Sequence, residues 1–262
     1  MAQGIWFIMK ITSVNNDLIK ETAKLLKSKY RKETGLFLIE GEKGVKEALE
    51  AGIELERIFV SDTEVIKNTD FDSLLIIETT EAVLSKISDT QTPPKLIAVA
   101  HQPKHSKKEL KNYNKVVLLE GIKDAGNLGT ILRSASAFGV DGIVLFGDTV
   151  DLYNPKCVRS TVGCLWKTPV FEIKDFEELK DIFLDFEKIA TLPQDTNVVC
   201  LDKFTPSEKT LIMFGSEANG LSKLLKDFAT KNLTIEMNSI VESLNLSVSA
   251  SIVMYKLSMF KV

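Results

Sequence analysis

The chain alternates between short apolar runs and helical patterns along almost its whole length. Runs rich in Leu, Ile, Val and Phe are separated by stretches with helical periodicity. This alternation is typical of α/β proteins, in which helices cover the faces of a sheet. Strands are expected at residues 36–40, 57–61, 74–78, 96–100, 116–120, 142–147, 188–192, 210–215 and 233–237. Helices are expected near residues 17–31, 42–51, 80–87, 128–138, 175–186 and 242–258.

A polar connector divides the chain into two parts. The stretch HQPKHSKKELKNYNK (101–115) carries five lysines and two histidines, and the run VVLLE (116–120) begins a second set of buried strands. We therefore expect a smaller α/β domain at residues 9–104, a basic linker at 105–115 and a larger α/β domain at 116–262. A length of 262 residues is ample for two hydrophobic cores.

Composition disfavours several classes of protein. The hydrophobic content of 44% is that of an ordinary globular chain. No apolar run approaches the roughly 20 residues that span a bilayer. The apolar start MAQGIWFIM lacks a basic flank and a clear cleavage site, so a signal peptide is not expected. Cys157, Cys164 and Cys200 form no CxxC pair, which favours a reducing, cytoplasmic location and argues against a structural zinc site; no other metal is expected.

Net charge and charge placement point in different directions. A net charge of −3 by itself argues against a nucleic-acid partner. Four cations nevertheless recur at helical spacing near residues 17–31 and are expected on one helix face. They are Lys20, Lys24, Lys27 and Arg31. Such a stripe suits an RNA phosphate backbone, whereas charge alone favours the alternative of a solvated helix face.

The first of three informative segments is EGIKDAGNLGTILRSASAFGVDGIVLFG (120–147). A buried strand ends at Glu120, a glycine-bearing turn follows, and a helix is expected to begin at Asn127 or Leu128. Arg133 shares the face opposite the apolar one with small neighbours, which leave room for a ligand. The alternative is an ordinary N-cap at Asn127 and an exposed helical arginine. Because GxGxxG and the phosphate-loop pattern are both absent, a nucleotide-dependent oxidoreductase is disfavoured.

The second segment, TLIMFGSEANGLS (210–222), runs from an apolar strand straight into a glycine-bearing turn. Ligands in open α/β sheets lie at the carboxyl ends of the strands, where glycine leaves the backbone bare. Glu217 at that edge is a candidate to bind a hydroxyl or an amine. Capping of the next helix is the alternative.

The third segment, LTIEMNSIVESLNLSVSASIVMYKL (233–257), reads as a strand, a loop and a helix that starts near Val241. Its first turn is expected to hold Ser243, Leu244 and Asn245. A narrow face of small residues follows, made of Ser243, Ser247, Ala250 and Ser251. Such a face lets another helix approach closely, within one fold or across a dimer. Close packing without chemistry is the alternative.

Together and in this order, the three segments resemble the SpoU (TrmH-like) branch of the SPOUT RNA methyltransferases. NLGTILRSASAFGV is similar to the first motif of that branch, GSEANGLS to the second and ESLNLSVSAS to the third. The resemblance covers residues 116–262, and residues 10–100 resemble the ribosomal-protein-like substrate-binding domain of rRNA-directed members. Two positions depart from the family pattern: Glu236 stands where proline is usual, and Ala218 where glycine is common.

The resemblance implies a trefoil-knotted α/β catalytic domain, an exception to the rule that chains are unknotted, in a homodimer. It implies methyl transfer from S-adenosyl-L-methionine to a ribose 2′-hydroxyl of RNA. By analogy, the N-terminal domain favours large-subunit rRNA over tRNA. A tRNA 2′-O-methyltransferase and a non-catalytic RNA-binding or ribosome-assembly protein of the same fold are the alternatives.

The resemblance also assigns site residues by motif position. The cofactor pocket would contain Gly215, Ile235, Leu244, Thr191 and Leu192. Substrate placement and catalysis would involve Asn127, Arg133, Glu217, Ser243 and Asn245. The family interpretation makes Arg133 the group that takes or weakens the hydroxyl proton. Because a guanidinium is almost always protonated, a more conservative role is phosphate binding and alkoxide stabilisation, with Asn127 orienting the ribose.

Overall fold

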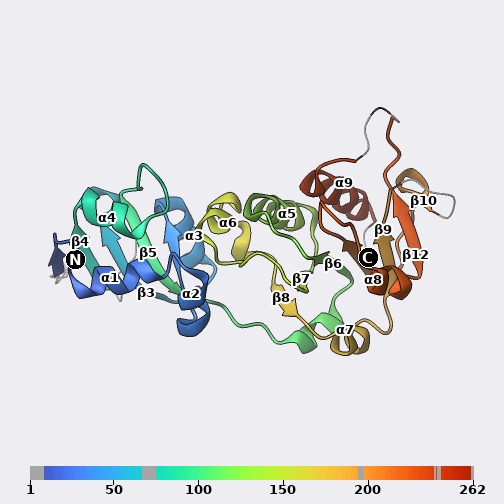
Figure 1. Ribbon diagram of the computed structural model, residues 1–262, viewed down its shortest axis with the longest axis horizontal. Coiled ribbons are helices and arrows are strands. Elements are labelled where there is room, and N and C mark those ends of the chain that lie inside the picture. Colours follow the sequence, from blue (N-terminus) through green and yellow to red (C-terminus); the bar gives the residue numbers. More distant parts are fainter. Residues whose placement is uncertain (1–8, 67–74, 194–197, 239, 241–242, 261–262) are drawn as a thin grey trace, which may run out of the picture. The chain divides into compact units, whose positions relative to one another are not determined.

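The structure is a computed structural model and describes residues 9–66, 75–193, 198–238, 240 and 243–260. The chain forms two compact units (Figure 1). The N-terminal unit combines the chain up to residue 103 with residues 151–166, and the C-terminal unit combines residues 104–150 with residues 167–262. In the described part of the chain, no helix is both long and apolar enough to cross a membrane.

The N-terminal unit is built on a mixed five-stranded sheet in the order β1-β4-β3-β5-β2. Its strands are β1 (Met9–Ile11), β2 (Leu36–Glu40), β3 (Leu55–Val60), β4 (Leu75–Thr79) and β5 (Leu96–His101). Its helices are α1 (Asp17–Lys24), α2 (Ser28–Thr34), α3 (Glu42–Glu50), α4 (Glu81–Ile87) and α6 (Pro155–Ser160), with short 3-10 helices η1 (Thr63–Ile66) and η3 (Cys164–Trp166). Side chains of α1 and α4 pack with β2–β5 in one hydrophobic core.

The C-terminal unit is built on a parallel seven-stranded sheet in the order β10-β12-β9-β11-β6-β7-β8. Its strands are β6 (Lys115–Glu120), β7 (Gly142–Phe146), β8 (Val170–Ile173), β9 (Glu187–Thr191), β10 (Val199–Cys200), β11 (Thr210–Phe214) and β12 (Lys231–Thr234). Its helices are α5 (Ala125–Phe138), α7 (Phe176–Ile182), α8 (Lys223–Phe228) and α9 (Leu246–Ser258), with 3-10 helices η2 (Lys107–Asn112) and η4 (Leu201–Lys203). Helices α5 and α9 lie on one side of the sheet, and α7 and α8 lie on the other (Figure 1).

The α/β fold class predicted from the sequence is confirmed. The inner strands β7 and β11 are buried along their whole length, which explains why they read as continuous apolar runs. Short elements escaped prediction, namely β1, β8, β10, α6 and α8, because too few residues carry a periodic signal in each. The trefoil knot stays a prediction.

Two predicted elements end or begin elsewhere. The strand expected at residues 233–237 stops at Thr234, and the next four residues leave the sheet. The helix expected from Val241, a position outside the described residues, begins at Leu246 with Asn245 as its N-cap. Asn245 fixes the start of the helix because its side chain accepts hydrogen bonds from the Ser247 and Val248 amides.

The two units differ from the predicted domain boundaries at residues 151–166, which fold with the N-terminal unit. The Asp151 carboxylate accepts hydrogen bonds from Nε and Nη2 of Arg31, at 3.0 and 2.7 Å. Phe37 on β2 stacks against Tyr153 and Trp166 of the same segment. An ion pair and aromatic packing therefore attach this segment to a sheet from which it is distant in sequence.

Candidate active site

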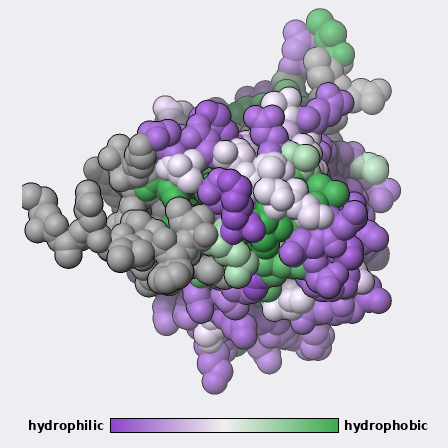
Figure 2. All heavy atoms as spheres, turned by 90° about the vertical axis from the view of Figure 1, so that its left-hand side faces the viewer, coloured by the Kyte–Doolittle hydropathy of each residue, from purple (hydrophilic) through white to green (hydrophobic). Residues whose placement is uncertain are grey.

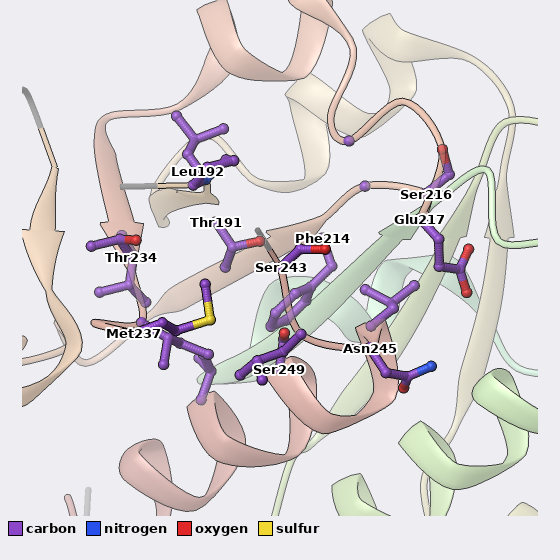
Figure 3. A pocket seen from close by; sticks show the side chains of 18 residues that line it. Thr191, Leu192, Phe214, Ser216, Glu217, Thr234, Met237, Ser243, Asn245 and Ser249 are labelled. Carbon is purple, nitrogen blue, oxygen red and sulfur yellow. The ribbon is translucent and has the colours of Figure 1, made fainter. Parts of the chain in front are cut away.

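A pocket of about 490 Å³ lies in the C-terminal unit at the carboxyl ends of β9, β11 and β12 and beside the start of α9 (Figure 3). This is the edge of a parallel sheet where ligands are expected, and the volume lies in the roughly 300–1,000 Å³ range of small-molecule sites. Its lining is formed by Thr191, Leu192, Pro193, Phe214, Gly215, Ser216, Glu217, Gly220, Leu233, Thr234, Ile235, Met237, Ser243, Leu244, Asn245, Leu246, Ser249 and Val253.

The five residues predicted to hold a cofactor all line this one pocket. They are Thr191, Leu192, Gly215, Ile235 and Leu244. The structure thus brings together positions from three separate stretches of sequence. Leu192 and Ile235 supply apolar walls, whereas the Thr191 hydroxyl donates to the Met213 carbonyl at 2.8 Å and leaves its own oxygen as an acceptor.

The turn after β11 is folded back so tightly that only glycine fits at its start. A Cβ atom at Gly215 would lie 1.9 Å from the Gly220 carbonyl carbon and 2.1 Å from the Leu221 nitrogen. The Gly220 amide donates to the Ser216 carbonyl at 2.8 Å and closes the turn. Glycine at position 215 thus lets the turn close on Gly220, and Gly215 itself lines the pocket.

A chain of hydrogen bonds at the pocket joins the three sequence motifs. Asn127 on α5 donates through Nδ2 to Oε1 of Glu217 at 2.5 Å, and Asn245 donates through Nδ2 to Oδ1 of Asn127 at 3.1 Å. The Oδ1 atom of Asn245 accepts from the Ser247 amide at 2.9 Å. The network fixes the orientation of both side-chain amides, and it holds the Glu217 carboxylate beside the neutral amides of Asn127 and Asn245.

Asn127 is not the helix N-cap that the sequence left open as an alternative. Asp124 caps α5 and accepts a hydrogen bond from the Asn127 amide, so α5 begins at Ala125. Asn127 therefore lies in the first turn, and its side chain is available to bond Glu217 and Asn245.

Arg133 lies further along α5, outside the lining of the pocket. It is exposed, and its neighbours Thr130 and Ala137 are small and exposed. Among the residues that the structure describes, no ion pair or hydrogen bond of the Arg133 guanidinium is found. Ser243, in contrast, lines the pocket together with Glu217 and Asn245 (Figure 3).

A model of the SpoU rRNA Methylase family matches residues 114–255 of this chain. The chain belongs to this family. A model of the MRM3-like substrate binding domain matches residues 16–98 of this SpoU methylase. The family predicted from the three motifs is therefore confirmed.

Relatives match this SpoU methylase over nearly its full length. The 23S rRNA (guanosine(2553)-2'-O)-methyltransferase RlmP of Bacillus subtilis is 32% identical over 95% of this chain and 98% of its own. The 23S rRNA (uridine(2479)-2'-O)-methyltransferase of Streptomyces viridochromogenes is 25% identical over 94% of this chain and 91% of its own. A crystal structure of AdoMet-bound rRNA methyltransferase from Sinorhizobium meliloti is 27% identical, with a TM-score of 0.86 over 95% of this chain and 97% of its own.

The cationic stripe predicted in the N-terminal unit of this SpoU methylase is not continuous. The predicted helix breaks after α1, and Lys27 has an extended backbone as the N-cap of α2. Lys20 pairs with Asp17 at 3.0 Å, and Lys24 pairs with Glu21 at 2.5 Å.

Arg31 corrects the predicted stripe. It is 1% exposed and bonds both Asp151 and the Leu25 carbonyl, so it is a structural residue rather than a surface cation. The regular spacing misled because it assumed one helix where the chain forms two. Figure 2, which views the left-hand side of Figure 1, shows a mostly hydrophilic described surface around a smaller hydrophobic area.

Sequence reasoning missed several lining residues. The rule that ligands lie at strand ends was sufficient to find Phe214 and Thr234. Ser249 and Val253 carry no such signal, because the direction of α9 depends on its packing against α5.

A group of potential metal ligands beside the pocket also escaped prediction. The ligand atoms of Cys200, Asp202 and Glu236 lie within 4.8 Å of one another. The Cys200 thiol donates to Oε1 of Glu236 at 3.0 Å, and this hydrogen bond raises the pKa of Cys200.

Proposed function

We propose that this SpoU methylase transfers the methyl group of S-adenosyl-L-methionine to a ribose 2′-hydroxyl of large-subunit rRNA. The observation that carries the proposal is the hydrogen-bonded group of Asn127, Glu217 and Asn245 beside a pocket at the carboxyl ends of the strands. Full-length relatives are named as 23S rRNA 2′-O-methyltransferases, and a structural neighbour is described as AdoMet-bound. We include a cytoplasmic location in this proposal, because the three cysteines form no CxxC pair and fit a reducing compartment.

The residues of the pocket fit the cofactor. The turn at Gly215 closes on Gly220 because position 215 has no Cβ atom, while Leu192, Ile235 and Leu244 offer apolar surface for a flat ring. Hydroxyl groups at Thr191 and Ser249 supply polar contacts. When bound there, S-adenosyl-L-methionine supplies an electrophilic methyl group.

The polar network is suited to hold the acceptor ribose. The Glu217 carboxylate has a second oxygen and further lone pairs available after bonding Asn127, so it can accept a ribose hydroxyl. Asn127 fixes that carboxylate through a hydrogen bond and is itself held by Asn245, and Ser243 adds a hydroxyl to the same wall. Orientation of the acceptor oxygen toward the methyl group is the main contribution that such a rigid group makes.

Arg133 acts on the RNA rather than on the cofactor. Its guanidinium is exposed and lies outside the pocket lining, so it can bind an RNA phosphate and stabilise the negative charge that develops on the acceptor oxygen. The hydroxyl proton passes to a water molecule as the new carbon–oxygen bond forms.

The role of Arg133 is tested with Arg133→Ala. This variant is expected to lose methyl transfer by about 100-fold or more while binding S-adenosyl-L-methionine as tightly as wild type. Lys223→Ala is a matched control, because Lys223 is an exposed cation that pairs with Asp227. Near wild-type turnover in Arg133→Ala would remove Arg133 from the mechanism.

The methylase is further proposed to act as a homodimer through α9. That helix exposes Val248 and Tyr255, and its C-cap Met259 is exposed as well; their exposed fractions are 46%, 53% and 56%. Tyr255 also packs edge-on against Phe138 of α5, with ring centroids 5.6 Å apart, which extends the apolar surface. Such a stripe on an outer helix is typical of a protein interface. Light scattering of wild type and Tyr255→Arg tests the dimer, which the variant is expected to dissociate.

RNA capture is assigned to the N-terminal unit. Lys20, Lys24 and Lys27 remain candidates for phosphate contacts, because they lie at or near the surface. Arg31 is left out, since it is buried in an ion pair. Weaker RNA binding by a triple alanine variant, with unchanged cofactor binding, would support this assignment.

The decisive experiment maps 2′-O-methylation across rRNA and tRNA with and without the protein. A single new methylated ribose in 23S rRNA is expected. Methylation of tRNA alone would replace the proposed substrate. Binding of rRNA without binding of S-adenosyl-L-methionine, measured by calorimetry on folded protein, would favour a non-catalytic RNA-binding protein.

A further inference from the structure

One wall of the pocket is a short segment that pairs with no strand among the described residues. Strand β12 ends at Thr234, and residues 235–238 continue outside the sheet. Ile235 and Met237 line the pocket, whereas Glu236 between them is exposed and absent from the lining. The side chains thus alternate, as in an extended chain, and Glu236 is directed away from the cofactor site.

The neighbouring edge strand reaches this wall through a side chain. Strand β10 pairs with β12 at only two positions, Val199 with Leu233 and Cys200 with Thr234. The Cys200 thiol then donates to Oε1 of Glu236 at 3.0 Å. This hydrogen bond therefore connects β10 to the segment that forms the wall, beyond Thr234, which is the last paired residue of β12.

Two carboxylates lie close to the Cys200 sulfur, so a negative charge at this position would be repelled and would break the hydrogen bond to Glu236. A carboxylate oxygen of Asp202 lies within 4.8 Å of both the Cys200 sulfur and the nearest Glu236 oxygen. Two carboxylates at this distance repel each other, and the neutral thiol beside them offers a proton to one.

We propose that Cys200 is a positioning residue of the cofactor pocket, whose thiol holds Glu236 and thereby the wall formed by Ile235 and Met237. This inference rests on the proposed function, because it assigns the wall to S-adenosyl-L-methionine. A negative charge at Cys200 would stand among two carboxylates and push Glu236 away. The wall would then move from the pocket, and cofactor affinity would fall while the sheet stayed folded.

Calorimetric titration of the full chain with S-adenosyl-L-methionine tests the proposal. Cys200→Ser keeps a donor and is expected to bind within about 2-fold of wild type. Cys200→Ala removes the donor and is expected to raise Kd by about 3–10-fold. Cys200→Asp adds a like charge and is expected to raise Kd by more than about 10-fold. Cys164→Ala is the matched control, since this cysteine belongs to the N-terminal unit.

Two further measurements separate positioning from other roles. In the Cys200→Asp background, Glu236→Gln removes the repelling charge and is expected to recover much of the affinity. The melting temperature of each variant without cofactor is expected to match wild type, because the pair is on an exposed edge. Chelation by EDTA is expected to leave the wild-type Kd unchanged.

The outcomes that overturn the inference are distinct from failure of the proposed function. Wild-type affinity in Cys200→Asp, equal losses in Cys200→Ser and Cys200→Ala, or a loss of affinity with EDTA would each reject the positioning role. Failure of the folded wild-type protein to bind S-adenosyl-L-methionine would reject the proposed function itself.

Discussion

The two units differ in whether they bury charged side chains. The N-terminal unit buries charged side chains, with Arg31 1% exposed against Asp151, and the Glu40 side chain 2% exposed against Arg159. The buried polar residues found in the described part of the C-terminal unit are uncharged hydroxyls, namely Thr168, Thr210, Thr234 and Ser247. Its pocket carboxylate, Glu217, is exposed.

Buried charged side chains stabilise the fold through ion pairs, whereas exposed charged side chains remain accessible to a ligand. A buried charge is tolerated only when an opposite charge compensates it, so neither side chain of a buried ion pair is available to bind a ligand. In the N-terminal unit, such ion pairs attach residues 151–166 to β2 and α2. In the C-terminal unit, Glu217 and Arg133 stay accessible, as their proposed roles toward RNA require.

The largest expected effect comes from breaking the Arg31–Asp151 pair. Asp151→Ala leaves the Arg31 guanidinium, which is 1% exposed, without its carboxylate. A charge left uncompensated in this way typically costs about 3–5 kcal/mol. Chemical denaturation monitored in the N-terminal unit measures this loss in the free energy of unfolding.

Asp148→Ala is the matched control for Asp151→Ala. Asp148 pairs with Lys123, but its side chain is 94% exposed. Loss of an exposed pair costs at most about 1 kcal/mol. Equal losses in the two variants would contradict the distinction between structural and accessible charges.

A smaller effect is expected from Gly215→Ala at the pocket. The added Cβ would lie 1.9 Å from the backbone at Gly220, so the turn has to open. We expect the affinity for S-adenosyl-L-methionine to fall by about 100-fold, equivalent to about 2.7 kcal/mol. Calorimetry measures it directly.

Gly220→Ala separates steric overlap from backbone strain in the same turn. Gly220 has a φ of +63° with no atom within 4 Å of an added Cβ. An L-residue in this left-handed region costs about 1–2 kcal/mol, and affinity should fall by less than in Gly215→Ala. A larger loss in Gly220→Ala would show that strain, not the close approach at Gly215, controls the pocket.

The smallest expected effect concerns Glu40, a second buried carboxylate of the N-terminal unit. Burial raises the pKa of Glu40, against the opposing effects of the Ser88 hydrogen bond and the Arg159 charge. The folded state therefore binds this proton more tightly than the unfolded chain. Its contribution to stability is largest at acidic pH and is lost as the pH rises through the folded-state pKa.

Glu40→Gln tests this sign. The amide is neutral at every pH, so the variant is expected to gain up to about 1 kcal/mol over wild type at neutral pH. The gain should vanish toward acidic pH in denaturation measured across this range. Glu54→Gln, at a side chain that is 79% exposed, is the control without such a trend. A gain that grows on acidification would contradict the sign.

Periodicity and motifs predicted most of the C-terminal unit. The strands β6, β7, β9 and β11 were found within one or two residues, because strands buried on both faces leave uninterrupted apolar runs. The residues predicted for the cofactor pocket came from strand ends and glycine turns, and they line one cavity. Their roles in methyl transfer stay predictions.

The sequence did not predict that residues 151–166 pack with the N-terminal unit. Asp151 is separated from Arg31 by 120 positions, and neither residue has a local pattern that indicates its partner. The regular spacing of the lysines before Arg31 also predicted a single helix, which the extended backbone at Lys27 interrupts. Burial of Arg31 by tertiary contacts therefore outweighed the helical spacing of the cations.

The sequence by itself determined the α/β class, the family and the residues around the pocket, because these depend on local periodicity and on short motifs at strand ends. Only the tertiary structure decided which charges are buried and which stay free. It placed Arg31 against Asp151 and Cys200 against Glu236, while it left the Arg133 side chain exposed. The physical reason is that the energy of a charge depends on its surroundings, which are assembled from distant parts of the chain.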